Sequence, residues 1–386
     1  METTLKQPLK VALVHEWITT IAGSEKVVEQ ILELYPHAEI FTIYADPKVV
    51  AKTSFLKNKV VHTSFLQRLP WIGKRFRALL PLLPLAIEQF DLSKFDLVIS
   101  SAHAVAKGVI TGPDQVHISY VHSPIRYAWD LQHQYLRESK LDSGPKSWLI
   151  RYFLHKIRIW DHRTAPGVDL FIANSKFIAR RIHKIYHRQA QVIYPPVDVD
   201  FFQPETEKKD FYLAASRLVP YKKVDIIVEA FASMPDKTLY VIGDGPDFQR
   251  LKARATPNVH LLGYKDSATL QRYMREAKAY LFAAEEDFGI MPVEAQACGT
   301  PVIAYGKGGA LETVRAVGLS SEPTGAFFDQ QTSAAVAEAV QRFEQGSADV
   351  SAANCRRNAE RFSIARFKAE FQAAVDAELT RFEQRR

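Results

Sequence analysis

The chain has 386 residues, of which 47% are hydrophobic and 24% are charged, and this length predicts two globular domains rather than one. No hydrophobic run reaches the roughly 18 residues of a membrane-spanning helix, no signal peptide is apparent, and two cysteines without metal-ligand spacing exclude a disulfide framework, so we expect a cytoplasmic protein. The net charge of +7 favours anionic partners, and because no nucleic-acid-binding module is apparent, we expect phosphorylated ligands or anionic lipids.

The first half of the chain alternates strand-like and helix-like segments. Residues 9–14 are predicted to form a buried strand, and a helix is expected to begin after the small-residue loop at Gly23. Further strands are expected at 38–44, 95–101 and 116–122. Such alternation is typical of a doubly wound α/β sheet, which binds ligands at the carboxyl ends of its strands. Gly23 follows the first of these strands and His122 lies at the carboxyl end of the last, although Gly23 could equally serve a turn and His122 could have a structural role.

The segment from 65 to 90 mixes aromatic, aliphatic and basic residues. Prolines at 70, 81 and 84 interrupt it, so it cannot form one long helix. The dense interleaving suits a membrane surface or a lipid-linked acceptor, and we expect contact with an anionic membrane here. The alternative is ordinary helices that pack on the first sheet while their basic side chains extend to solvent. The residues concerned are Phe65, Leu66, Leu69, Trp71, Ile72 and Phe76, with Arg68, Lys74, Arg75 and Arg77.

A helical hairpin and a domain boundary follow. Residues 135–165 are expected to form helices on either side of a break at 143–145, with aromatic and basic faces. A strand, a helix and a strand over 169–197 would close the first sheet. Prolines 195 and 196 and the polar run 204–210 then mark a boundary. We therefore predict domains at 1–200 and 205–362, followed by an amphipathic tail at 363–386.

Two cations stand between a strand and a helix at the start of the second domain. Arg217 can contact phosphate oxygens with two N–H groups, and Lys222 supplies a compact charge. Two cations at a helix N-terminus are unfavourable unless an anion lies between them, which predicts a bound diphosphate. The alternative is a solvated basic turn. Gly243 and Gly245 lack the full dinucleotide fingerprint, so an NAD site is not expected.

The stretch 285–294 joins a predicted strand to a predicted helix. The start of a helix attracts anions and sugar hydroxyls, and Gly289 lets a ligand approach the backbone closely. Glu286 and Glu294 flank this loop and could hold two parts of one ligand. Alternatively, Glu294 only complements the helix dipole and Glu286 is a solvated loop residue.

The sequence EDFGIMPVEAQACGTPVIAYGKGGALETV resembles the nucleotide-sugar-binding signature of retaining glycosyltransferases of family 4. The SRLVPYK stretch is similar to the SRLVPxK motif of that family, and VHSPIRYAWD resembles the HTPxRYxWD stretch of a subgroup with bacterial polysaccharide mannosyltransferases. The resemblance implies the GT-B fold, with two Rossmann-like domains, an interdomain cleft and a C-terminal helix that crosses back to the N-terminal domain. Residues 1–200 with 363–386 would bind the acceptor, and 205–362 would bind the donor.

The resemblance also implies roles for individual residues. Glu294 would hold the ribose of the donor, Glu286 would lie by the transferred sugar, and His122 would face that sugar. Arg217 and Lys222 would neutralise the leaving diphosphate. Further donor contacts would come from Phe288, Gly289, Ile290, Gly263 and Tyr264. Acceptor-side contacts would come from Gly23, Arg126, Tyr127 and Trp129, the last three of which could equally be packing residues. Two positions depart from the family pattern, because Ala22–Gly23 stands where two glycines are frequent and Lys223 where glycine is frequent.

The function implied is the metal-independent, retaining transfer of a hexose from a nucleotide-diphosphate sugar to a lipid-linked or polysaccharide acceptor. The subgroup resemblance points to mannose from GDP-mannose and to cell-surface glycan synthesis such as that of lipopolysaccharide, on the inner face of the membrane. We expect no metal, no cofactor and no nucleic-acid partner. The alternatives are a GT-B sugar-nucleotide epimerase and a non-catalytic nucleotide-sugar-binding protein.

Overall fold

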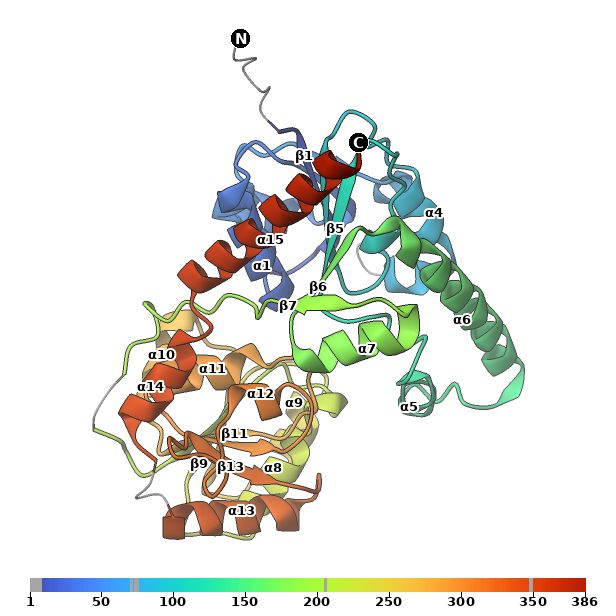
Figure 1. The fold of residues 1–386 in the computed structure, drawn as a ribbon. Coiled ribbons are helices and arrows are strands. Elements are labelled where there is room, and N and C mark those ends of the chain that lie inside the picture. The colour runs from blue at the N-terminus through green and yellow to red at the C-terminus, as the bar shows by residue number, and fades with distance from the viewer. Residues whose placement is uncertain (1–8, 70–71, 73–75, 205–206, 347–349) are drawn as a thin grey trace, which may run out of the picture. The chain divides into compact units, whose positions relative to one another are not determined.

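The computed structural model describes residues 9–69, 72, 76–204, 207–346 and 350–386. The chain forms two compact units, the first made of Met1–Ile193 with Lys368–Arg386 and the second made of Tyr194–Phe367. Each unit contains one parallel sheet with helices packed against it (Figure 1).

The sheet of the first unit has seven strands in the order β3-β2-β1-β4-β5-β6-β7. Neighbouring strands pair in parallel, and the central strands are almost continuously buried, as expected of hydrophobic strands covered by helices. The strands are β1 (Val11–Ile18), β2 (Glu39–Ala45), β3 (Val61–Thr63), β4 (Leu97–Ala102), β5 (Val116–Val121), β6 (Leu170–Ala173) and β7 (Ala190–Val192). The strand order changes direction between β1 and β4, and ligands of open α/β sheets bind at such a point.

Helices and short 3₁₀ turns connect these strands. The α-helices are α1 (Gly23–Leu34), α2 (Pro47–Lys52), α4 (Leu83–Glu88), α5 (Gln132–Glu138), α6 (Gly144–Thr164) and α7 (Lys176–Tyr186). The 3₁₀ turns are η1 (Ser54–Leu56), η2 (Phe65–Arg68), η3 (Phe76–Leu82), η4 (Ala106–Gly108) and η5 (Ala165–Gly167). Two helices are found in the region predicted to form a helical hairpin, but the break between them lies at 139–143, because α6 begins at Gly144.

The last helix, α15 (Ile364–Arg385), carries the chain back to the first unit. Its Lys368 pairs with Glu33 of α1, and the ring of Phe371 lies 6.5 Å from that of Tyr120 in β5. Phe371 and Val375 are fully buried. The C-terminal helix expected from the family resemblance is therefore confirmed.

The segment from 65 to 90 is broken into η2, η3 and α4, with Pro81 inside η3, as the prolines predicted. The prediction that Leu66 and Ile72 offer surface to a membrane was wrong, because both are buried in the core of the first unit. Arg68 is exposed. Trp71, Lys74 and Arg75, and the side chains of Phe76 and Arg77, lie outside what the structure describes.

The sheet of the second unit has six strands in the order β10-β9-β8-β11-β12-β13, again parallel throughout. The strands are β8 (Tyr212–Ala215), β9 (Leu239–Ile242), β10 (Val259–Gly263), β11 (Ala279–Phe282), β12 (Val302–Tyr305) and β13 (Gly325–Phe328). The connecting helices are η6 (Pro220–Lys222), α8 (Val224–Ala232), α9 (Phe248–Lys252), α10 (Ser267–Glu276), α11 (Ile290–Ala297), α12 (Ala310–Thr313), α13 (Ser333–Gly346) and α14 (Ala352–Glu360). Here the strand order changes direction between β8 and β11.

The predicted fold class is correct, but the predicted end of the first strand is not. The α/β class with two doubly wound parallel sheets is confirmed. The first strand is longer than predicted, because β1 continues past residue 14 to Ile18. His15 and Glu16 therefore lie on a buried strand rather than in the loop that follows it.

Candidate active site

The residues predicted to bind the donor gather at one edge of the second sheet. Arg217 and Lys222 follow β8, the 285–289 loop follows β11, and Gly263 ends β10. Because these strands are parallel, their carboxyl ends share one edge, and β8 and β11 are the pair where the strand order changes direction.

Lys222 and Glu286 are in direct contact at this edge. The ammonium group of Lys222 pairs with Oε1 of Glu286, and the two side chains are 16% and 20% exposed. The residues are 64 positions apart in the sequence, so only the sheet brings them together. Arg217, in contrast, is exposed and makes no side-chain hydrogen bond or ion pair with another described residue.

The loop that carries Glu286 lies against a second loop with the sequence Lys307–Gly308–Gly309. The N–H of Gly309 donates to the carbonyl of Glu286 at 2.7 Å. A Cβ on Gly309 would lie 2.3 Å from Cα of Phe288, and one on Gly308, whose φ is +63°, would lie 2.4 Å from the Glu286 carbonyl oxygen. Only glycine permits such close contact of two backbones. No role was predicted for this pair of glycines, although they belong to a GKGG run in the sequence.

Donor contacts were predicted at Phe288, Gly289 and Ile290. Phe288 can make such a contact only through its backbone. Its side chain is 3% exposed, and its ring packs 5.4 Å from that of Phe362. Gly289 caps α11 in a left-handed conformation, and Ile290 is the first residue of that helix. The first N–H groups of a helix have no carbonyl partner one turn earlier, so they suit a ligand with acceptor oxygens.

Glu294 is a buried carboxylate of α11, with 4% of its surface exposed. Burial and the charge of Glu294 raise the pKa of the Tyr280 hydroxyl, which donates a hydrogen bond to the carbonyl of Ala215 at 2.6 Å. Tyr280 belongs to β11 and Ala215 ends β8, so Glu294 lies near the pair of strands between which the strand order changes direction. A hydroxyl that reaches Glu294 would meet a carboxylate with little competing water.

The positions next to Arg217 have conformational reasons for their residues. Lys223 has a φ of +54°, which explains why the related motif favours glycine there. A Cβ on Gly243 would lie 1.8 Å from the Ser216 carbonyl oxygen, so this glycine allows the loop before Arg217 to pack. Gly263 accepts a hydrogen bond from the N–H of Gly243 at 2.9 Å, and Tyr264 is 78% exposed.

In the first unit, a buried carboxylate holds the loop after β4. Oε1 of Glu16 accepts hydrogen bonds from the N–H groups of His103, Ala104 and Ala106 at 2.9, 2.8 and 3.1 Å. Oε2 of Glu16 lies 2.8 Å from Nδ1 of His103. Burial favours the neutral acid, but the imidazole of His103 and the N–H groups outweigh it and hold the pKa of Glu16 far below its usual range. The side chain of His103 is 27% exposed, so this histidine reaches the surface.

A second carboxylate–histidine pair lies beside the first. Buried His15 is 3.3 Å from Oε1 of Glu25 through Nε2, and 3.1 Å from Oγ of Ser101 through Nδ1. Burial lowers the pKa of His15, but Glu25 and Glu16 outweigh it and raise it overall. Burial acts against the charge of Glu25 as well, yet His15 and the N–H of Ala22 lower its pKa to about 2. A phosphate placed at Gly23, the first residue of α1, would lie in the same helical turn as this carboxylate.

His122 completes this cluster as a neutral group. Its Nε2 is 2.8 Å from Oγ of Ser101, which also contacts His15. Burial, with the nearby charges of His103 and His15, lowers the pKa of His122 to about 3. His122 can therefore exchange hydrogen bonds with a ligand but carries no positive charge near neutral pH.

The other predicted acceptor-side residues are partly used in packing. The indole N–H of Trp129 donates to Asp161 at 2.7 Å, and Asp161 also pairs with buried Lys107 at 2.9 Å. The ring of Tyr127 lies 6.2 Å from that of Tyr135. Both aromatic residues are packed against the core of the first unit, whereas Arg126 is half-buried.

The cluster in the first unit was not predicted beyond His122. The sequence did contain features that could have indicated Glu16, Glu25 and His103. Glu16 and His103 are polar residues that closely follow hydrophobic strand segments, and Glu25 lies in the first turn of a helix. Within the part of the chain that the structure describes, no group of three or more His, Cys, Asp or Glu residues is arranged to hold a metal ion. Among the same residues, no helix is both long and hydrophobic enough to cross a membrane.

Family models match both halves of the chain. Residues 23–201 match the model described as Glycosyltransferase Family 4, and residues 198–362 match the model described as Glycosyl transferases group 1. A D-inositol 3-phosphate glycosyltransferase of Mycolicibacterium paratuberculosis is 31% identical over 186 residues, which cover 41% of this chain and 41% of that protein. An uncharacterized glycosyltransferase of Methanocaldococcus jannaschii is 31% identical over 151 residues, which cover 38% of this chain and 42% of that protein. The chain thus aligns with about two-fifths of the length of these relatives.

Solved structures resemble the whole chain. HepE of Anabaena in complex with UDP has a TM-score of 0.69 at 17% identity, over 96% of this chain and 100% of HepE. The lipopolysaccharide outer core galactosyltransferase WaaB has a TM-score of 0.64 at 18% identity, over 96% and 100%. At this level of identity the similarity shows the fold alone. The chain therefore has the GT-B fold, and each half matches a glycosyltransferase family model.

Proposed function

We propose that this chain, both halves of which match glycosyltransferase families, is a retaining glycosyltransferase. It would move a hexose from a nucleotide-diphosphate sugar to a lipid-linked or polysaccharide acceptor. The observation that carries the proposal is the contact of Lys222 with Glu286 at the sheet edge where the strand order changes direction between β8 and β11. A cation beside a carboxylate at a ligand-binding edge suits the two parts of such a donor, with Lys222 on the diphosphate and Glu286 by the sugar.

In this proposal the bond between the anomeric carbon and a diphosphate oxygen breaks while the acceptor oxygen bonds to that carbon from the same face. The configuration of the sugar is thereby retained, and the acceptor proton leaves on the departing oxygen. Arg217 and Lys222 stabilise the negative charge that develops on the diphosphate. Glu286 stabilises the positive charge that develops on the sugar ring, and no protein nucleophile is required. Glu294 holds the ribose.

The acceptor would bind to the first unit at the His103–His122 cluster. His103 reaches the surface and is held at Nδ1 by buried Glu16, which leaves Nε2 for a ligand. Neutral His122 supplies a second hydrogen-bonding group. The two histidine rings are 6.4 Å apart, so one sugar residue could contact both.

The donor we propose is GDP-mannose, because VHSPIRYAWD resembles a subgroup with mannosyltransferases. The uridine donors are the alternative, since HepE has been crystallised with UDP-glucose and WaaB is a galactosyltransferase. The test is to incubate the protein with GDP-mannose, UDP-glucose and UDP-galactose, and to measure the released nucleoside diphosphate by chromatography. We expect release from GDP-mannose at least tenfold above the others, and its loss in Glu286→Gln.

The same incubations separate the alternative functions. Nuclear magnetic resonance of the unreleased nucleotide sugar would reveal an epimer if the protein were an epimerase. Binding without release or epimerisation would indicate a non-catalytic protein. A folded protein that neither binds nor cleaves any nucleotide sugar would refute the proposal.

We further propose that the protein works at the inner face of an anionic membrane, in the synthesis of cell-surface glycans such as lipopolysaccharide. The net charge of +7 supports such a location. A lipid-linked acceptor would be presented there.

A further inference from the structure

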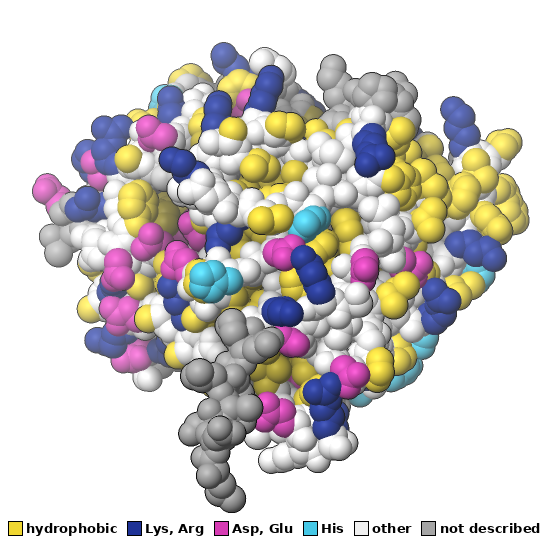
Figure 2. All heavy atoms as spheres, turned by 90° about the horizontal axis from the view of Figure 1, so that it is seen from above, with side chains coloured by type: hydrophobic (Ala, Val, Ile, Leu, Met, Phe, Trp, Pro, Cys, Tyr) yellow, Lys and Arg dark blue, Asp and Glu magenta, His cyan; other side chains and the backbone are white. Residues whose placement is uncertain are grey.

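Helix α6 carries an exposed stripe of aromatic, aliphatic and basic side chains. Trp148, Tyr152, Lys156, Ile159 and Arg163 are spaced by four, four, three and four residues, which places them on one helical face. Trp148 is 80% exposed, Tyr152 54% and Ile159 51%. In Figure 2, hydrophobic side chains gather with Lys and Arg at the right-hand edge, where Figure 1 places α6. Exposed hydrophobic surface of this kind commonly marks an interaction site.

The charge of this helix is one-sided. Its 21 residues include Lys146, Arg151, Lys156, Arg158 and Arg163. Its one acidic residue, Asp161, is fully buried and occupied by Lys107, Trp129 and Tyr186. Glu88 lies 3.5 Å from Arg163, but the side chain of Arg163 remains 70% exposed. The stripe therefore presents cations to solvent without an equal number of carboxylates.

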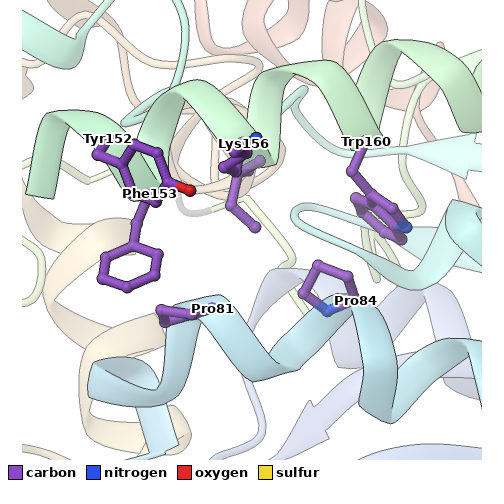
Figure 3. Close-up of a pocket in the computed structure, with 7 residues that line it drawn as sticks. Pro81, Pro84, Tyr152, Phe153, Lys156 and Trp160 are labelled. Atoms are coloured by element: carbon purple, nitrogen blue, oxygen red, sulfur yellow. The ribbon is translucent and has the colours of Figure 1, made fainter.

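A hydrophobic groove of about 360 Å³ adjoins the stripe. Figure 3 shows Phe153 and Trp160 reaching from α6 toward Pro81 of η3 and Pro84 of α4. The indole N–H of Trp160 is bonded to Glu88 at 2.7 Å, so the tryptophan offers the groove only its ring. Lys156 and Tyr152 also line the groove and belong to the stripe.

These features together select one kind of partner. A second copy of the chain would bring the same cations face to face in a symmetric dimer, which like charges oppose. A water-soluble anion would not require the exposed Trp148 or the hydrophobic groove. An anionic bilayer satisfies all three features, since tryptophan and tyrosine favour its interface, cations attract its headgroups and a lipid chain fills a hydrophobic groove.

We propose that the α6 stripe docks on an anionic bilayer and that the groove between α6 and the η3–α4 segment takes one lipid hydrocarbon chain. The inference rests on the proposed function for its lipid-linked acceptor, and it names the surface that meets the membrane. It also places this contact on α6, whereas the sequence alone pointed to residues 65–77.

The test is sedimentation of the full chain with vesicles of phosphatidylcholine containing 0, 15 or 30% phosphatidylglycerol. Binding should rise with phosphatidylglycerol and fall with salt. Lys156→Gln with Arg163→Gln should lower the partition coefficient about 30-fold, from about 1 kcal/mol per charge. Trp148→Ala with Tyr152→Ala should lower it by about tenfold or more. The matched control, Lys252→Gln with Lys265→Gln, removes two exposed cations of the second unit and should change nothing.

Occupancy of the groove has its own measurement. Vesicles with brominated acyl chains should quench tryptophan fluorescence in the Trp148→Phe variant, and Phe153→Asp in that background should reduce the quenching. Unchanged quenching would refute the groove site. Wild-type protein that ignores 30% phosphatidylglycerol at low salt, or equal binding by all variants, would refute the docking surface. A wild-type protein that forms dimers, and a Trp148→Ala variant that does not, would also refute the docking surface. Nucleotide release needs no vesicles, so its loss would instead count against the proposed glycosyltransferase.

Discussion

Replacing Glu286 by Gln should strengthen the binding of free nucleoside diphosphate while it lowers turnover. In the free protein Lys222 is paired with Glu286, so a diphosphate must compete with this carboxylate for the ammonium group. With side chains 16% and 20% exposed, the pair is more shielded than a surface ion pair, and we take its value as about 1 kcal/mol. Removing the competitor should therefore tighten binding of GDP or UDP about fivefold.

The assay is isothermal titration of the nucleoside diphosphate into wild type, Glu286→Gln, Lys222→Ala and the double variant. The gain from Glu286→Gln should disappear when Lys222 is already absent, because the competition then no longer exists. Glu285→Gln is the matched control, since it removes an exposed carboxylate one residue earlier and should leave the affinity unchanged. An affinity that stays equal or weakens in Glu286→Gln would refute a shared role of Lys222 for carboxylate and diphosphate.

Arg217→Ala should weaken diphosphate binding by about 1.5–3 kcal/mol and leave nucleoside binding intact, and titration of both ligands checks this. Glu294→Gln should weaken nucleoside and diphosphate alike through lost ribose hydrogen bonds; an effect confined to the diphosphate would contradict the assignment. Turnover should survive excess EDTA, and a requirement for Mg²⁺ or Mn²⁺ that addition restores would count against Arg217 and Lys222 as the charge-neutralising pair. The low pKa of Glu25 contributes up to about 3 kcal/mol of stability above pH 4.5, lost as the pH falls toward 2, so urea unfolding of Glu25→Gln should show a flatter acid limb than wild type.

Local patterns in the sequence were sufficient for the doubly wound α/β class, whereas the GT-B fold and most of the donor-side assignments came from the family resemblance. Hydrophobic runs such as the one before Arg217 predicted buried strands, and parallel strands bring their carboxyl ends to one edge. Because Lys222 and Glu286 each follow such a strand, the sequence pattern predicts that they lie at the same edge of the sheet. It does not reveal that the two side chains pair directly, because the pairing depends on loop conformations set by Gly309 and Lys223.

The first unit shows where local patterns fail. Glu16 is 87 residues from His103, and nothing near either residue indicates the other. The predicted first strand ended at Val14 because the hydrophobic run ends there and charged residues are rarely buried unless they are paired. The partners of His15 and Glu16 come from other elements, so the sequence around the strand does not reveal them. The prediction that Leu66 offers surface to a membrane was wrong for a related reason. Leu66 and Trp148 look equally hydrophobic in sequence, but Leu66 is buried and Trp148 is 80% exposed.

The return of α15 to the first unit sets an order for folding during synthesis. The second unit ends at Phe367, whereas the first unit still lacks Lys368–Arg386 when that point of the chain is made. Phe371 and Val375, both fully buried, are then missing from the first hydrophobic core. The unit that leaves the ribosome first is thus the last to be completed, and until then its surface beside Tyr120 stays open to chaperones or to aggregation.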